Sequence, residues 1–279
     1  KLAKGQLRGD SYILENNNQP FLFLGESASI IPLAIIAKIL GSVSTTFAIA
    51  DLIFPALLFL LIHLWLKKNK FQLTFSILGA AAPIIIPYFS SLVPFLEKEG
   101  TVITGTIKDP LFLSRTPHPQ ISTIFLFASI FLTANILDKS SKKALFLWAI
   151  LIGVSLYASA FVGSTIALSI ALLLPLLFIK LKKSLLKPIL VILIIALPLL
   201  INTIDLKSYI DNDFLARTTY EQKLLFPRQL RYIAIAFLLY LIRKDSFSKV
   251  LLATVASAAI LSDLHQIILG YAIDADHWI

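Results

Sequence analysis

Residues 163–204 read GSTIALSIALLLPLLFIK, then LKKSLLK, then PILVILIIALPLLINTI. Two apolar runs are joined by a short connection, residues 180–187, that holds four lysines. Each run approaches the roughly 20 residues with which a helix crosses about 30 Å of hydrocarbon. Two apolar helices with a lysine-rich connection between them form the unit that we expect to recur along the chain.

Three more connections of this kind occur, at residues 67–70, 138–143 and 243–249. We call the four connections the lysine turns. The apolar runs around them predict eight helices, at roughly 45–66, 72–95, 120–137, 143–161, 163–180, 185–204, 229–243 and 247–262. A shorter apolar run, 27–41, carries Lys38 and ends at Gly41. We expect it to be an interfacial or re-entrant helix.

Composition also indicates a membrane protein, with 57% hydrophobic and 15% charged residues and a mean hydropathy of +0.84. Soluble domains are nearer a quarter charged. We therefore expect an all-α polytopic membrane helix bundle of about eight transmembrane helices, forming a single domain over residues 1–279. Its parts are a first outer loop (1–26), the interfacial helix (27–41), the transmembrane bundle (45–262) and an outer tail (263–279). The absence of cysteine excludes disulfides and thiolate metal sites.

The distribution of charge predicts the orientation. The lysine turns hold 13 of the 25 Lys and Arg residues, and 14 of the 16 acidic residues lie elsewhere. Short basic loops stay cytoplasmic, so both ends and the longer segments, 1–26, 96–119, 205–228 and 263–279, are expected on the exocytoplasmic face of a prokaryotic plasma membrane. The net charge of +9 is dispersed over loop anchors, which argues against binding to nucleic acid.

Two acidic residues of the first outer loop are candidate catalytic groups. Asp10 follows Arg8 and Gly9 in a turn-like setting, and Glu26 lies between Gly25 and Ser27. A carboxylate beside the membrane can act as a general base or hold a divalent cation. The alternatives are a solvated turn for Asp10, and for Glu26 a helix start at which the dipole favours negative charge.

Basic residues in the second and third outer segments are candidate phosphate ligands. The stretch Ser114-Arg115-Thr116-Pro117-His118-Pro119-Gln120 directly precedes an apolar run, and its arginine offers a planar donor fork for phosphate. His118 and Gln120 could add donors. Arg228 and Arg231 are three residues apart at the start of a helix and so share a face. All of these arginines could instead anchor the helices to lipid headgroups.

The outer tail carries a weaker candidate. Asp276 and His277 suggest an acceptor site, a metal site or a proton-transfer pair, although a metal would need a third ligand. The sequence therefore identifies neither a metal nor a cofactor. A divalent cation is the ion that such groups could hold.

Polar residues inside the apolar runs give further expectations. We expect Asp51 to face a protein cavity or water, His63 and Trp65 to be interfacial, and Asn135 to form an interhelical hydrogen bond.

The chain resembles the GT-C superfamily of membrane glycosyltransferases. An acid-bearing first outer loop is followed by a membrane-hugging helix and many short spans, and residues 114–120 and the ending, Gln266 to Gly270 with Asp276-His277-Trp278, are similar to uncharacterised bacterial members. The resemblance implies transfer of a sugar from a polyprenyl-phosphate donor to an acceptor on the outer face. It implies Asp10 as the base, with Glu26 as its substitute, and phosphate binding by Arg115 and Arg228 with support from His118.

Two other classes of function remain open at the level of the sequence. A transporter or lipid flippase would use broken helices and polar sites at the bilayer midplane, with breaks at Pro83, Pro87, Pro94, Pro175 or Pro198. A non-catalytic membrane scaffold would show scattered charges in its outer loops. The partners expected in every case are membrane lipids, and in the enzyme a lipid-linked sugar; the oligomeric state is open.

Overall fold

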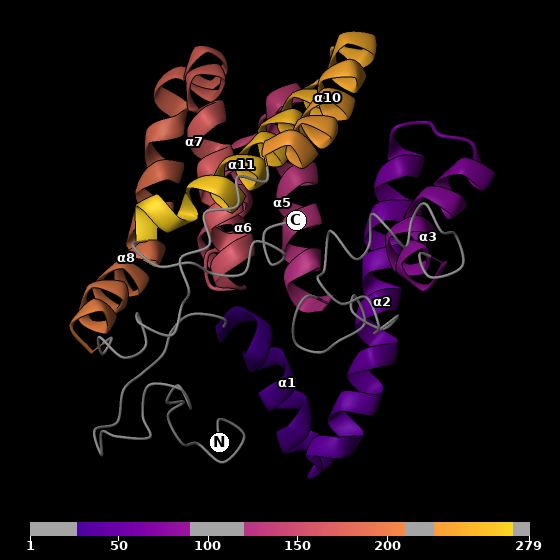
Figure 1. Ribbon diagram of the computed structural model, residues 1–279, viewed down its shortest axis with the longest axis vertical. Coiled ribbons are helices and arrows are strands. Elements are labelled where there is room, and N and C mark those ends of the chain that lie inside the picture. Colours follow the sequence, from indigo (N-terminus) through magenta and orange to yellow (C-terminus); the bar gives the residue numbers. More distant parts are fainter. Residues whose placement is uncertain (1–26, 90–119, 210–225, 270–279) are drawn as a thin grey trace.

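The computed structural model describes residues 27–89, 120–209 and 226–269, and within these ranges it contains helices and no strands. The all-α class is therefore confirmed for this part of the chain (Figure 1). The elements are α1 (Ser27–Leu40), α2 (Val43–Lys68), α3 (Leu73–Phe89), α5 (Gln120–Asp138), α6 (Lys142–Ser155), α7 (Ala160–Leu181), the 3-10 helix η4 (Lys182–Leu185), α8 (Leu186–Tyr209), α10 (Phe226–Arg243) and α11 (Ser246–Leu269).

Three helical stretches of the described residues are long and apolar enough to cross a membrane: Val43–Lys68, Gln120–Asp138 and Phe161–Ile201. The third combines α7, η4 and most of α8, and Figure 1 shows the chain reversing direction at η4. Three further helices are apolar but shorter. These stretches indicate a helical membrane protein.

Serine caps set several helix starts. Ser42, Ser141 and Ser159 have extended backbones, and their hydroxyl oxygens accept hydrogen bonds from backbone N–H groups three residues on, at 3.2, 3.1 and 3.1 Å. Such caps satisfy donors that the first turn leaves unpaired. The cap at Ser159 also explains a corrected boundary. The sequence predicts one helix over 143–161, whereas α6 ends at Ser155 so that α7 can begin at Ala160.

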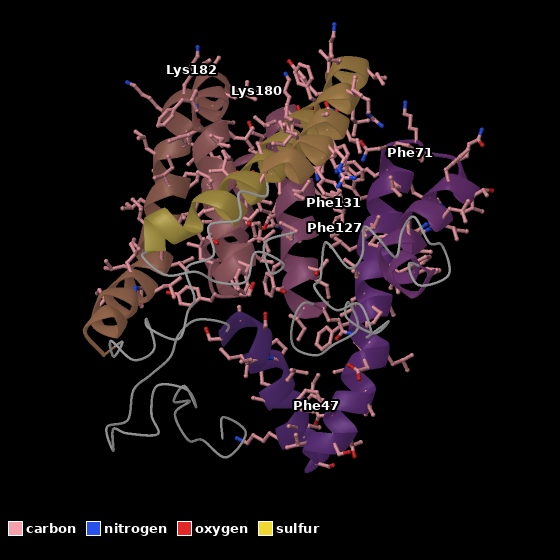
Figure 2. The ribbon with its side chains drawn as sticks, viewed as in Figure 1. Phe47, Phe71, Phe127, Phe131, Lys180 and Lys182 are labelled. Carbon is pink, nitrogen blue, oxygen red and sulfur yellow. The ribbon has the colours of Figure 1, made fainter. Side chains whose placement is uncertain are left out.

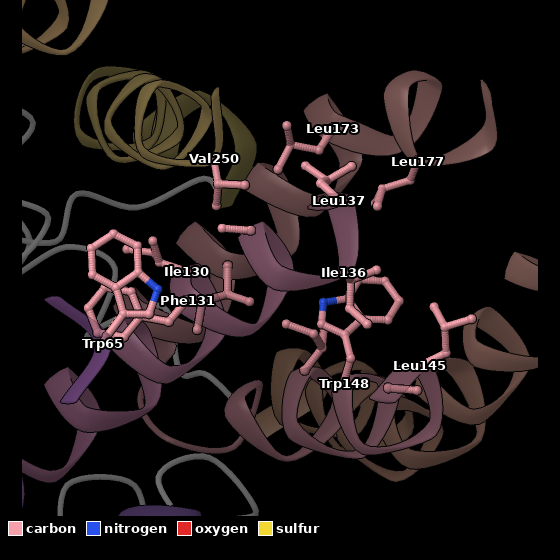
Figure 3. Close-up of a cluster of buried hydrophobic side chains, with 14 of the residues drawn as sticks. Trp65, Ile130, Phe131, Ile136, Leu137, Leu145, Trp148, Leu173, Leu177 and Val250 are labelled. Carbon is pink, nitrogen blue, oxygen red and sulfur yellow. The ribbon is translucent and has the colours of Figure 1, made fainter. Parts of the chain in front are cut away.

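Helix α5 lies at the centre of the bundle, where it packs against α2, α6, α7 and α11. In the described residues α3 packs mainly on α2, and α10 mainly on α11. Two tryptophans anchor the core (Figure 3). The Trp148 indole is fully buried and its Nε1 donates to Thr133 Oγ1 at 2.9 Å. Trp65, predicted to be interfacial, is instead buried between Phe131 and Phe247, with ring centroids 4.4 and 4.3 Å away.

Helices α1 and α2 form a V that projects from the bundle (Figure 1). Gly41, with φ of +67°, makes the tight turn at its tip, because glycine adopts this conformation without a steric penalty. The start of α1 is fixed to the α6–α7 connection, where Ala28 N–H donates to Tyr157 O at 3.0 Å and Ser29 Oγ donates to Ala158 O at 2.5 Å. The helix that the sequence predicts over 27–41 is thus present as α1, docked by its N-terminus.

Candidate functional site

The four lysine turns lie at one end of the bundle, which we call the lysine end (Figure 1). Each turn joins helices that are consecutive in the described chain: α2 to α3, α5 to α6, α7 to α8 and α10 to α11. Figure 2 shows Lys180 and Lys182 at the tip of the α7–α8 turn. The remaining ends of these helices therefore lie away from the lysine end.

Side chains connect the turns to one another. The Arg243 guanidinium carbon lies 5.3 Å from the centroid of the Phe71 ring, which brings the α10–α11 turn against the α2–α3 turn. Lys68 Nζ donates to Asn135 Oδ1 at 3.0 Å, from the end of α2 to the end of α5. The interhelical hydrogen bond predicted for Asn135 is confirmed. These contacts link three of the four lysine turns to one another.

Asp245 fixes the start of α11. One carboxylate oxygen accepts from Ser248 N–H at 2.8 Å and the other from Arg243 Nε at 2.7 Å. Partial burial alone would raise the pKa of this carboxyl, but the hydrogen bonds from Ser248 and the nearby Arg243 charge bring the pKa below its ordinary value. The charged form is favoured in the folded protein, so its contribution to stability is present at neutral pH and is lost as the pH falls through the folded-state pKa.

The candidate catalytic and phosphate-binding segments join the helices at the opposite end. Residues 115–118 lead into α5, which begins at Gln120, and Glu26 immediately precedes α1. Gln120 itself is 1% exposed, so the first turn of α5 starts inside protein. Asp10, Glu26, Arg115, His118, Asp276 and His277 lie outside the described residues.

Arg228 and Arg231 both belong to the first two turns of α10, as the sequence predicts. Their spacing of three residues puts them on one face of that helix. Arg231 is exposed at the surface. These two arginines are the predicted phosphate ligands whose backbone the structure places, and they lie at the end of α10 remote from Arg243 and the lysine end.

The structure also describes Asp51 and His63, two of the polar residues that lie within the apolar runs. Asp51 is exposed on α2, and His63 Nδ1 lies 3.2 Å from Ser76 Oγ and its ring stacks on Phe59. Within the described ranges no group of three or more His, Cys, Asp or Glu side chains could hold a metal ion. A metal site at Asp276 and His277 stays a prediction.

A row of hydroxyl groups between α5, α6, α7 and α11 was not singled out from the sequence. Ser129 Oγ lies 3.1 Å from Ser155 Oγ, and Ser169 Oγ lies 3.1 Å from Thr254 Oγ1. Ser129, Ser169 and Thr254 line a small cavity of about 10 Å³, which is enough for roughly one water molecule and far too small for a sugar or a lipid. The signal that could have found them is the recurrence of Ser and Thr within the apolar runs.

No protein-family model matches this chain, and neither a curated protein nor a solved structure matches it. Inferences about its function therefore rest on its residues and their arrangement.

Proposed function

We propose that the protein is an integral membrane glycosyltransferase of the GT-C type with about eight spans in the plasma membrane. It moves a sugar from a polyprenyl-phosphate donor to an acceptor on the exocytoplasmic face. One observation carries the proposal. The segments that bear the candidate acid and the candidate arginines join α1, α5 and α10 at helix ends remote from the lysine turns, and lysine-rich turns mark the cytoplasmic side.

The proposed reaction needs a base and an anion site. Asp10, or Glu26 in its place, accepts the proton of the acceptor hydroxyl as the acceptor oxygen attacks the anomeric carbon of the sugar. The bond between that carbon and the phosphate oxygen breaks, and the phosphate leaves on its lipid. Arg115 and Arg228 stabilise the negative charge, with His118 and Arg231 in support.

Lipid-facing surface supports a lipid-linked donor. The apolar side chains of α8 are largely exposed, among them Leu190, Leu193 and Leu197 at 57, 54 and 53%. Outside a membrane such a surface would be unstable in water. A polyprenyl chain dissolved in the bilayer would bring its phosphate to headgroup level, the level at which the arginines of a helix start lie.

The transporter alternative predicts features that the described residues lack. Pro175 and Pro198, two proposed break points, lie inside continuous helices α7 and α8. The cavity between α5, α7 and α11 admits no more than about one water. The described residues thus give the transporter no support, but the same small cavity would not hold a sugar either. The activity test distinguishes the enzyme from the transporter and the scaffold.

The activity test uses the full chain in proteoliposomes with a panel of polyprenyl-phosphate sugars, and measures release of polyprenyl phosphate. Asp10→Asn and Arg115→Ala should each lower the rate on the order of 100-fold or more. Asp138→Asn, an exposed aspartate at the lysine end, is the matched control and should leave the rate unchanged. Turnover that survives both substitutions would remove the proposed roles, and an inert wild-type chain would favour the scaffold.

The topology can be tested directly because the chain contains no cysteine. Single cysteines at Ser140 and Ser184 in lysine turns should resist a membrane-impermeant maleimide in intact cells. Cysteines at Ser11 and Ser114 in the outer segments should react. Labelling of Ser140→Cys in intact cells would contradict the orientation, and with it the placement of the acid on the outer face.

A further inference from the structure

Three lysines have a backbone conformation that is normally left to glycine. Among the described residues, the non-glycine positions with positive φ are Lys70 (62°), Lys182 (48°) and Lys244 (53°). Each belongs to a lysine turn. Side chains with a Cβ are unfavourable in this region, and helices that end in it normally do so on glycine or asparagine.

The other end of the molecule provides an internal comparison. At the tip of the α1–α2 turn the positive φ, +67°, falls on Gly41. The chain thus uses glycine for a tight turn there, yet uses lysine in three turns at the lysine end. Lys182 is the most unusual, because φ of 48° and ψ of −133° correspond to the first central position of a type II′ turn, where glycine is standard. We infer that the charge of these side chains outweighs the strain.

Acidic side chains in the same turns do not neutralise these lysines. The lysine turns contain 13 Lys and Arg but only two aspartates, Asp138 and Asp245, and Asp245 is already paired with Arg243 at 2.7 Å. No carboxylate in the described part of the chain pairs with Lys70, Lys182 or Lys244, which are exposed. Closely spaced cations that no carboxylate neutralises repel one another, and binding of an external anion would offset this repulsion.

The neighbours of the three lysines show what kind of anion is near. Within four residues of each lysine the surface becomes apolar: Leu73 is 57% exposed, Ile179 75% and Ile242 80%. Cations that directly border lipid-facing side chains lie at the level of lipid phosphates. An acidic soluble protein would not require that border, so the arrangement favours a lipid surface over a protein partner.

We propose that the lysine end is a binding surface for the phosphate groups of anionic lipids in the adjacent leaflet, with Lys70, Lys182 and Lys244 as its contacts. The Arg243–Phe71 contact and the Lys68–Asn135 hydrogen bond link three of the four turns, so Lys70 and Lys244 belong to one connected surface. Lys182, in the fourth turn, lies at the same end of the bundle (Figure 2). This proposal depends on membrane insertion but not on sugar transfer.

The test compares two triple variants of the full chain in nanodiscs. In the first, Lys70, Lys182 and Lys244 are replaced by glycine, which removes the charge and relieves the strain; in the second they are replaced by arginine, which keeps the charge. Native mass spectrometry measures the preference for phosphatidylglycerol over phosphatidylcholine. At about fivefold per basic residue near an anionic leaflet, the glycine variant should lose preference on the order of 100-fold, and the arginine variant should retain it.

Two controls separate lipid binding from turn stability. Lys38→Gln removes an exposed cation from α1, away from the lysine end, and should not change the preference. In zwitterionic detergent the glycine variant should unfold at the same or a higher temperature than the wild type, because glycine tolerates positive φ. The proposal is overturned if the glycine variant keeps the wild-type preference, or if the wild type itself does not prefer the anionic lipid.

Discussion

Helix α5 and the α7–α8 stretch are both apolar enough to cross a membrane, yet the protein buries them very differently. Of the apolar window in Gln120–Asp138, 56% is buried, against 17% for that in Phe161–Ile201. The more buried helix is the less hydrophobic of the two. In a soluble protein the opposite order is expected, because water drives the most apolar helix inside.

The difference shows what holds this bundle together. Lipid tails solvate leucine as well as a protein core does, so apolar area alone does not drive one helix against another. The buried face of α5 instead carries Ser129 and Thr133, which bond to Ser155 and to the Trp148 indole. Close packing and interhelical hydrogen bonds stabilise α5, while α8 contributes a lipid-facing surface.

The largest effect should come from Trp148, the α6 side chain that packs on α5. Trp148→Ala opens a cavity and leaves Thr133 without its indole donor, and should lower the free energy of unfolding by about 3–5 kcal/mol. Unfolding by SDS in mixed micelles measures the loss. Leu147→Ala, at a neighbouring position that is 51% exposed, is the matched control and should lose less than about 1 kcal/mol. Equal losses would mean that burial does not determine how much each of these two side chains contributes to the free energy of unfolding.

The next effect tests the inner face of α8. A Cβ at Gly153 of α6 would lie 2.9 Å from Ile195 Cβ, so Gly153→Ala should cost about 1–3 kcal/mol by overpacking. Ile195→Ala in the same chain keeps that Cβ but removes Cδ1 and Cγ2, which would lie 2.9 and 3.0 Å away, and should recover part of that loss. At Gly79 the nearest atom, also at 2.9 Å, is the flexible tip of Leu66, so Gly79→Ala should cost less. A double variant that is no better than Gly153→Ala would contradict the close α6–α8 contact.

A smaller effect is expected for the hydroxyl pair between α5 and α6. Ser129→Ala, Ser155→Ala and the double variant form a thermodynamic cycle across the 3.1 Å Oγ–Oγ contact. The coupling free energy should be about 0.6 kcal/mol, the average for interhelical hydrogen bonds in membranes. The pair Ser164 and Ser140, which make no such contact with each other, provides the reference cycle. Zero coupling for Ser129 and Ser155 would leave packing alone to explain the burial of α5.

The smallest effect should be on the outer face of α8. Leu190→Ala and Leu197→Ala remove side chains that are more than half exposed, and each should change the free energy of unfolding by less than about 0.5 kcal/mol. The same SDS titration applies. A loss above about 2 kcal/mol would show that this face packs against another protein or a second copy of the chain.

The positions of most helices could be predicted from the sequence. Runs of apolar residues punctuated by lysines predict helices over 163–180 and 229–243, and the structure has Ala160–Leu181 and Phe226–Arg243. Length and hydropathy determine these boundaries to within a few residues. The error at 143–161 arose because a short Ser159-capped break lies within continuous apolar sequence.

Helix pairing and the site were harder to predict. The contact of α11 with α7 includes the hydroxyl pair Ser169 and Thr254, residues that look like neutral members of apolar runs in the sequence. Tryptophan is a residue type typical of membrane interfaces, but aromatic partners from α5 and α11 bury Trp65. Of the candidate site, Arg228 and Arg231 are placed on α10, and Asp10, Glu26, Arg115, His118, Asp276 and His277 stay predictions.

Helix α11 is synthesised after the helices on which it packs, α5, α7 and α10. Ser169 of α7 bonds to Thr254 across 85 residues of sequence, so the ribosome must continue for about 4–17 s after Ser169 before its partner exists, at 5–20 residues per second. During that interval Ser169 of α7 lacks this partner, whereas Ser129 and Thr133 of α5 already have theirs on α6. We expect this half-assembled intermediate to be the state that membrane proteases recognise, and completion of α11 to be the step that protects the nascent protein from degradation.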